Sequence, residues 1–418
     1  MGTALRRYWW PAIPSSDLPK PDSAPVRVRL LGEDFVVFRD TEGRVGMLDE
    51  TCCHRGASLV LGRVEQGGIR CLYHGWKFAV DGTVLETPNC KDPAFKTRFK
   101  ARSYPAREAG GFVWVYIGPK EEEPPFVAYD YFGVEASHRW IAPAVFDANF
   151  VQVLEGFVDS SHLGILHQDA WKPVGFLETD TSKRLLGHLA PDIEAEDTDF
   201  GFCYAALRTT PAEDGPPITT ARLTAYVAPT TVFFAMGTRP AFGSATFTVP
   251  VDDVRTIVHS LFWDKERAIN EEPLRSQMQP FFGMDPAILD AFGASREQAD
   301  RPDKPSRNNH FLQDRDAMAR GRSWTGLPTF IPEDVAICGS MGPIYDRSRE
   351  HLVPSDVGVL RMRRALIESA RRVQRGERPI GLDKPFDTSQ IRCIESVVTP
   401  ANPWQRLIPG RKPPEGAA

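Results

Sequence analysis

Two short cysteine–histidine pairs constrain this chain more than any other feature of its sequence. Cys52 and His54 are two positions apart, Cys71 and His74 are three apart, and sixteen residues lie between the pairs. A glycine follows each pair, so each pair can form a loop at the tip of a β-hairpin. Two such loops that face each other would place four ligand side chains around one small inorganic centre.

The ligand types leave two kinds of metal centre open. Two thiolates and two imidazoles can hold one zinc ion in a tetrahedral site. They can also hold a [2Fe–2S] cluster, with the cysteines on one iron and the histidines on the other, and the neutral imidazoles raise the reduction potential of such a cluster. Zinc-finger ligands usually run cysteine–cysteine and then histidine–histidine, whereas each pair here is mixed. The order of the ligands therefore favours the iron–sulfur cluster.

The composition excludes several classes of protein. The 418 residues include 50 Lys and Arg against 55 Asp and Glu, a net charge of −5, which offers no electrostatic footprint for nucleic acid. Seven cysteines are an odd number and thinly spread, which argues against a secreted disulfide framework. The apolar run at 112–117 is too short to span a bilayer, and residues 1–11 lack the apolar segment of a signal peptide. We therefore expect a soluble cytoplasmic protein that binds neither nucleic acid nor a membrane.

The distribution of turns and periodic segments predicts an α+β chain. Short strands separated by glycine turns indicate an all-β domain over 1–125, whose last residues, 120–125, are charged and proline-rich like a linker. Residues 126–375 combine helices and strands, so we expect an antiparallel sheet flanked by helices, with Ser355 capping the last helix. Residues 376–418 contain seven prolines and little periodicity, which predicts an irregular C-terminal arm.

A second group of candidate ligands lies on a segment with helical spacing, 149–167. Asp159 and His162 are three positions apart and would share a helix face. His167 lies five positions beyond His162, about 140° round an ideal helix. A common metal would require the helix to bend or end, and Gly164 lies where that can happen. Two histidines with one carboxylate can hold non-haem Fe(II) and leave positions open for O2.

The residues around these ligands resemble a known family. The motif Cys-x-His…Cys-x-x-His, with His54-Arg55-Gly56 and Tyr73-His74-Gly75-Trp76, is the pattern of Rieske proteins of the ring-hydroxylating oxygenase branch. Over about residues 4–370 the chain is similar to the terminal oxygenase component of Rieske non-haem iron oxygenases. It is most similar to the phthalate 4,5-dioxygenase branch, which also contains aromatic O-demethylases. The matching stretches include 6–9, 31–34, 68–76, 152–167, 308–312 and 333–356.

The resemblance implies two metal centres in each subunit, one [2Fe–2S] Rieske cluster in the domain 1–125 and one mononuclear non-haem Fe(II) in the catalytic domain 126–375. It assigns the cluster to Cys52, His54, Cys71 and His74. It assigns the mononuclear iron to His162, His167 and Asp334. Glu333 and Asp346 are rival carboxylates for the third position.

The resemblance gives Asp159 a different role, as a hydrogen-bonded bridge between His74 and His162. In the family the two bridged histidines belong to different subunits, so the chain is expected to form a homotrimer or a multiple of one. A carboxylate suits this role because it accepts N–H bonds from both rings. The alternatives for Asp159 are a surface carboxylate or an extra iron ligand.

One departure from the family pattern lies just before the bridge. Relatives often carry a polar Asn or Asp within two residues of it, whereas this chain has Phe157 and Val158. A side-chain hydrogen bond to water or substrate at that place is therefore in doubt. Three nearby polar residues could substitute for it: Asn149, Gln152 and Glu155.

The implied reaction uses electrons from NAD(P)H and inserts oxygen from O2 into an organic substrate. No dinucleotide-binding G-x-G-x-x-G loop follows a strand, so the electrons must come through a separate reductase. The branch suggests an aromatic carboxylic acid, which needs a cationic partner in an apolar pocket. The candidate partners are Arg208, Arg222 and Arg239, with Phe234 and Met341 as candidate walls.

Three alternatives remain open at this stage. An O-demethylase of a methoxylated aromatic acid would use the same metal centres. A Rieske electron carrier would keep the cluster without oxygenase activity. A zinc-structural binding protein would use the first four ligands for a single zinc ion.

Overall fold

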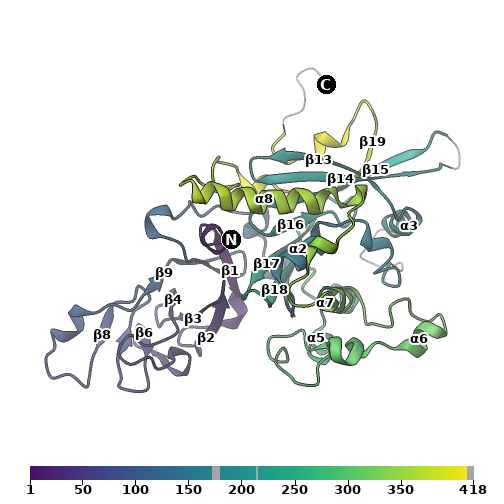
Figure 1. Cartoon of the computed structure of the whole chain (residues 1–418). Coiled ribbons are helices and arrows are strands. Elements are labelled where there is room, and N and C mark those ends of the chain that lie inside the picture. The colour runs from purple at the N-terminus through teal and green to yellow at the C-terminus, as the bar shows by residue number, and fades with distance from the viewer. Residues whose placement is uncertain (172–178, 213–214, 412–418) are drawn as a thin grey trace. The chain divides into compact units, whose positions relative to one another are not determined.

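The computed structural model describes residues 1–171, 179–212 and 215–411. The chain divides into two compact units, Gly2–Phe126 and the part from Val127 onward (Figure 1). No helix within the described residues is both long and apolar enough to cross a membrane.

The Gly2–Phe126 unit consists of small antiparallel sheets and a short helix, α1 (Gly2–Leu5). One sheet has the order β1 (Trp9–Pro14), β11 (Phe112–Tyr116), β10 (Ala106–Ala109). A second has the order β2 (Val26–Leu30), β3 (Glu33–Arg39), β4 (Val45–Asp49), β9 (Ser103–Tyr104). The third is β5 (Arg63–Glu65), β6 (Gly68–Arg70), β7 (Lys77–Phe78), β8 (Val84–Glu86). A buried cluster that includes Val36, Phe38, Ile69 and Phe78 packs directly beneath Cys52 and Cys71.

The second unit is built on an eight-stranded antiparallel sheet. Its main path runs β12 (Arg139–Phe146), β18 (Thr256–Asp264), β17 (Phe242–Pro250), β16 (Thr231–Phe234), β15 (Ile218–Val227), β14 (Gly201–Thr210), β13 (Asp192–Thr198). The eighth strand, β19 (Glu395–Val398), pairs with β15. Together with the all-β first unit, this arrangement confirms the predicted α+β fold.

The same unit contains the helices α2 (Phe150–Val158), α3 (Thr179–Gly187), α4 (Leu274–Phe281), α5 (Pro286–Phe292), α6 (Arg315–Ala319), α7 (Phe330–Ser340) and α8 (Val357–Gln374). Of these, α2, α7 and α8 contact strands of the sheet. α2 contacts β17, α7 and α8, and α8 also contacts β13 and β14 (Figure 1). The core between helices and sheet is rich in aromatic side chains, including Phe146, Phe262, Phe282 and Phe330.

Two local predictions differ from the structure. The residues expected as an irregular arm contain β19, and Trp404 and Ile391 are buried, because the prolines fall outside the paired residues and leave β19 free to pair. The last helix begins at Val357 with Asp356, not Ser355, at its N-cap. A 3-10 turn, Pro354–Asp356, runs directly into α8 and takes Ser355 into its own first turn.

Candidate metal centres and substrate pocket

Two loops of the Gly2–Phe126 unit repeat one backbone pattern. In the first, the amide of Gly56 donates to the carbonyl oxygen of Cys52 (2.8 Å), and in the second, the amide of Gly75 donates to that of Cys71 (3.0 Å). Both glycines have positive φ, 74° and 76°, a conformation in which a Cβ is disfavoured. Each cysteine therefore starts a tight turn, and the histidine of its pair lies inside that turn.

The loops bring the four candidate cluster ligands together. Cys52 and Cys71 are buried free thiols, and the rings of His54 and His74 have their centroids 4.6 Å apart. The indole of Trp76 stacks on His54, with centroids 4.7 Å apart and planes within 1°, so packing fixes that imidazole. The Nδ1 atom of His74 is buried and has no hydrogen-bond partner within the described residues.

These side chains fit a bound iron–sulfur cluster. Burial, with a smaller contribution from Cys71, raises the pKa of the Cys52 thiol to about 12. A buried imidazole nitrogen without a partner is costly, whereas a buried neutral thiol behaves as a small apolar group. Coordination to a metal would satisfy the nitrogen, and the charge of the metal would deprotonate the two thiols despite their burial.

The second group of ligands begins at the end of α2. The Asn149 side chain caps this helix by accepting from the amide of Val151 (3.0 Å). The expected helix 149–167 is too long, because α2 ends at Val158 and Asp159 is extended (φ −92°, ψ 132°). The carboxylate of Asp159 accepts from the amide of Ser161 (2.7 Å), and an aspartate that bonds the backbone ahead of it competes with helix continuation.

Asp159 nevertheless meets His162, which begins a short 3-10 turn, His162–Gly164. Its Oδ2 lies 3.1 Å from His162 Nδ1. Burial raises the pKa of Asp159, but the hydrogen bond and charge of His162, with the donors of Ser161, lower it to about 2. Gly164 has a steric role, because a Cβ there would lie 2.4 Å from the carbonyl oxygen of Leu185 on α3.

His167 is held between two carboxylates from the first turns of α7. Its Nδ1 lies 2.7 Å from Glu333 Oε2, and its Nε2 lies 3.3 Å from Asp334 Oδ1. The Thr325 hydroxyl donates to the other Glu333 oxygen (2.7 Å), and the ring of Phe330 stacks on His167 at 4.5 Å. His167 and Glu333 are almost fully buried, so their geometry is set by packing.

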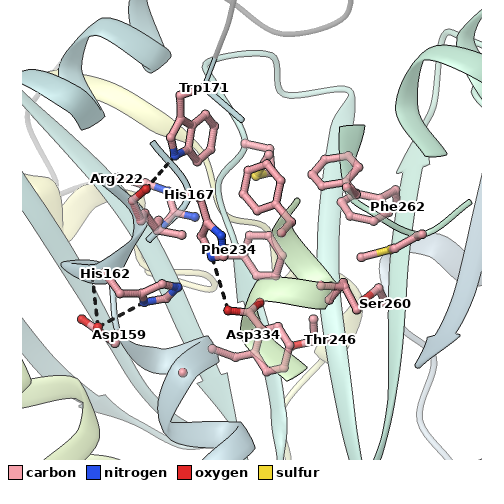
Figure 2. A pocket seen from close by; sticks show the side chains of 18 residues that line it. Asp159, His162, His167, Trp171, Arg222, Phe234, Thr246, Ser260, Phe262 and Asp334 are labelled. Carbon is pink, nitrogen blue, oxygen red and sulfur yellow. Dashed lines mark hydrogen bonds and ion pairs between the residues drawn. The ribbon is translucent and has the colours of Figure 1, made fainter. Parts of the chain in front are cut away.

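His162, His167 and Asp334 can bind one metal ion. Each offers a ligand atom, and these atoms all lie within 4.8 Å of one another (Figure 2). Burial lowers the pKa of His167, but the charges of Asp334 and Glu333 outweigh burial and raise it to about 9. The surroundings therefore favour a positive charge at this point, which a divalent cation can supply in place of the proton.

The two rival carboxylates are engaged elsewhere. Glu333 forms a hydrogen bond with Nδ1 of His167, the nitrogen that faces away from Asp334, and so orients that ring. The sequence pattern did not suggest this role. Asp346 caps a separate 3-10 turn by accepting from the amide of Ser348 (3.1 Å). Only the adjacency of Glu333 to Asp334 could have hinted at its role.

A pocket opens beside these ligands and is mostly apolar (Figure 2). Its apolar lining is Phe157, Leu163, Trp171, Phe234, Met236, Phe262, Phe282, Met284, Phe330 and Ile331. Phe234 is a wall as expected, whereas Met341 is 42% exposed and does not line the pocket. Its polar lining away from the metal ligands and Asp159 is Arg222, Thr246 and Ser260.

None of the three proposed polar substitutes reaches this pocket. The side-chain amide of Gln152 donates to the carbonyl oxygen of Gly342 (2.9 Å) and accepts from the backbone amide of Tyr345 (2.7 Å). Glu155 pairs with Arg347 and Arg363, and Asn149 caps α2. Phe157 itself faces the pocket, so that position is apolar in this chain.

Of the three candidate arginines, only Arg222 lines the pocket. Its Nε donates to the carbonyl oxygen of Ala235 (2.9 Å), and burial lowers the pKa of its guanidinium. Arg208 donates to backbone carbonyl oxygens, including that of Ser160 (3.2 Å). Arg239 pairs with Asp264 (3.2 Å) and Glu266.

Arg222 also lacks a carboxylate partner among the described residues. Its cross-strand neighbour on β19 is Glu395. That carboxylate is already bound by Arg184 Nε (2.6 Å) and the Thr181 hydroxyl (3.1 Å), and its charge only partly offsets the burial that lowers the pKa of Arg222. A buried cation that makes no ion pair is costly, and an anionic ligand in the pocket would reduce that cost.

Two family models match most of the chain. Residues 8–105 match the Rieske [2Fe-2S] domain, and residues 115–412 match the domain described as LigXa C-terminal domain like.

Relatives are similar over most of their length. The phthalate 4,5-dioxygenase oxygenase subunit of Pseudomonas putida is 38% identical over 415 residues, 97% of this chain and 90% of that protein. The 5,5'-dehydrodivanillate O-demethylase oxygenase subunit of a Sphingobium species is 29% identical, over 91% of this chain and 78% of that protein. The crystal structure of dicamba monooxygenase bound to dicamba has the same fold, with a TM-score of 0.60 at 17% identity over 89% of this chain and 99% of that chain.

Proposed function

The chain belongs to the Rieske non-haem iron oxygenases of the phthalate 4,5-dioxygenase branch, and we propose that it is a terminal oxygenase that hydroxylates or dihydroxylates an aromatic carboxylic acid. The observation that carries the substrate class is Arg222, a buried cation that makes no ion pair within the described residues and lines the pocket beside His162, His167 and Asp334. Because the chain belongs to this family, it has the family's two iron centres and uses O2.

We assign the cluster to Cys52, His54, Cys71 and His74, and the mononuclear iron to the three ligands around the pocket, His162, His167 and Asp334. When bound, these groups supply single electrons and O2 activation. The residues of the chain hold and orient them: Asp159 fixes the ring of His162, Glu333 fixes the ring of His167, and the apolar walls exclude water from the pocket.

Electrons reach the cluster from a separate NAD(P)H-dependent reductase in this proposal. Asp159 then links His74 of a neighbouring subunit to His162, which requires a homotrimer or a multiple of one. Two properties of Asp159 support this role: its carboxylate is ionised over the ordinary pH range, with a pKa of about 2, and it already bonds His162.

The substrate carboxylate would bind Arg222 and leave the aromatic ring among the phenylalanines. Charge-assisted hydrogen bonds to a guanidinium are the stronger kind and are geometrically specific. Because the site is apolar apart from Arg222 and a few hydroxyls, a neutral analogue of the acid would leave the cation unsatisfied.

Substitution of Arg222 tests this assignment. Arg222→Gln should raise KM for benzoate and phthalate by roughly 10- to 100-fold, the loss of one charged hydrogen bond, and should leave binding of the methyl esters nearly unchanged. Arg239→Gln is the matched control, because Arg239 is paired outside the pocket and should change neither. Equal KM values for the acids in wild type and Arg222→Gln would reject the carboxylate site.

The second candidate activity is O-demethylation of a methoxylated aromatic acid, favoured by the O-demethylase relative. Enzyme and reductase incubated with 18O2 and a panel of phthalates and methoxybenzoates distinguish the two, because dihydroxylation adds oxygen to the ring and demethylation releases formaldehyde. The absence of any substrate-dependent O2 uptake, with a reducible cluster present, would instead indicate an electron carrier.

A further inference from the structure

Two hydroxyls that line the pocket make no hydrogen bond within the part of the chain that the structure describes. Thr246 on β17 and Ser260 on β18 are directly opposite each other in the antiparallel register. Each is 1% exposed, and both line the pocket. Within the described residues neither Thr246 Oγ1 nor Ser260 Oγ has a hydrogen-bond partner.

The place of this pair at the pocket distinguishes it from other buried hydroxyls of the same sheet, such as those of Thr224 and Thr248, which also lack a partner within the described residues but do not line the pocket. Thr246 and Ser260 lie in the interior of a sheet, where apolar side chains are the rule and a buried hydroxyl without a partner costs free energy. A valine and an alanine would fill nearly the same volume without that cost. The cost is recovered when a ligand in the pocket supplies a donor or an acceptor to the two oxygens.

The hydroxyl pair and Arg222 lie on opposite sides of two of the metal ligands, His167 and Asp334. In Figure 2, Arg222 is on one side of His167 and Asp334, and Thr246 and Ser260 are on the other. Along the sheet, β17 is two strands and β18 three strands from β15, which carries Arg222. At about 4.8 Å between strands, these separations are about 10 Å and 14 Å, so the two polar places cannot bind the same group of the substrate.

We propose that Thr246 and Ser260 form a second substrate subsite, which binds an uncharged oxygen substituent such as a phenolic hydroxyl. The inference rests on the proposed function, because the carboxylate of the same molecule is placed at Arg222. Among the described residues that line the pocket, Arg222 is the only arginine or lysine, so a neutral group suits the hydroxyl pair better than a second carboxylate. Two anchors on either side of His167 and Asp334 fix which ring carbon faces these ligands.

Calorimetric binding to the anaerobic holoenzyme tests the subsite, with benzoate and the three hydroxybenzoates as probes. Wild type should bind at least one hydroxybenzoate about 10-fold more tightly than benzoate, as expected for one satisfied hydroxyl pair. In the double variant Thr246→Val/Ser260→Ala this preference should fall below about 2-fold, while the Kd for benzoate stays within about 2-fold of wild type.

Thr248→Val is the matched control. Thr248 is buried and lies on β17 two residues beyond Thr246. Its hydroxyl also lacks a hydrogen-bond partner among the described residues, but it does not line the pocket. It should keep the wild-type preference. The inference is overturned if wild type shows no preference for any hydroxybenzoate, or if the double variant retains it. Unchanged binding of all four acids by Arg222→Gln would instead reject the carboxylate site and leave the test of the hydroxyl pair intact.

Discussion

The two candidate metal sites differ in what holds their ligands in place. In the Gly2–Phe126 unit, the ligands lie on two loops, each of which contains the same kind of backbone turn. The indole of Trp76 holds the imidazole of His54 by stacking. In the second unit, His167 and Asp334 come from distant parts of the chain, and carboxylates hold the histidines. The first site therefore depends on local backbone conformation, and the second depends on how helices pack and on buried charge.

The difference predicts how each site responds to substitution. A site made by local turns should lose its metal when a ligand is removed and change little otherwise. A site held by buried carboxylates should also respond to residues that touch no metal, because those residues fix the orientation and basicity of the ligands.

Removal of a ligand from the packed site should have the largest effect. Asp334→Ala should abolish turnover and lose the mononuclear iron, because the two remaining histidines leave the site with too few ligands and uncompensated charge. The ratio of iron to acid-labile sulfide should fall while the visible colour of the cluster remains. Retained mononuclear iron would move the third ligand to another acid, with Glu333 the adjacent candidate.

The reciprocal substitution tests whether the loop site is independent. Cys71→Ser should bleach the cluster, because serine replaces a thiolate that bonds iron. Cobalt(II) added to the purified variant should still bind at His162, His167 and Asp334, with the visible spectrum of the wild-type site. Loss of cobalt binding would mean that the two sites do not fold independently.

Asp159→Asn should separate metal binding from electron transfer. Both metal centres should stay loaded, while turnover falls by about 100-fold, the upper range for loss of an outer carboxylate. The amide retains one acceptor but loses the charge that favours bonds from two imidazoles. Iron and sulfide analysis gives the loading, and O2 uptake with reductase gives the rate; wild-type turnover would remove Asp159 from the bridge role.

The smallest effect should come from the support of His167. Glu333→Gln should weaken binding of mononuclear metal by about 10-fold, because the neutral amide makes the imidazole less basic. Thr325→Val should cost less, because it removes only the hydrogen bond to Glu333. Competition with a chelator measures both affinities; equal affinity in wild type and Glu333→Gln would show that packing on Phe330 alone holds His167.

The sequence was most informative where the structure is local. The spacing of Cys52, His54, Cys71 and His74 encodes two tight turns, so the motif alone predicts the loops. The apolar spacing after Asn149 likewise predicts α2, because a single face of that helix is buried.

Predictions were weaker where long-range packing decides. The choice of Arg222 over Arg208 and Arg239 depends on which strand faces the pocket. The role of Glu333 depends on α7 meeting His167. Periodicity and composition carry no information on which residues from distant parts of the chain come into contact.

The pocket draws its metal ligands and its polar substrate contacts from different elements. His162 and His167 come from the turns after α2 and Asp334 comes from α7, whereas Arg222, Thr246 and Ser260 come from strands of the sheet. The strands can therefore exchange side chains that face the pocket without displacing the segments that carry the ligands. A chain built in this way can acquire a new substrate through one or two sheet substitutions while its oxidation chemistry is inherited unchanged.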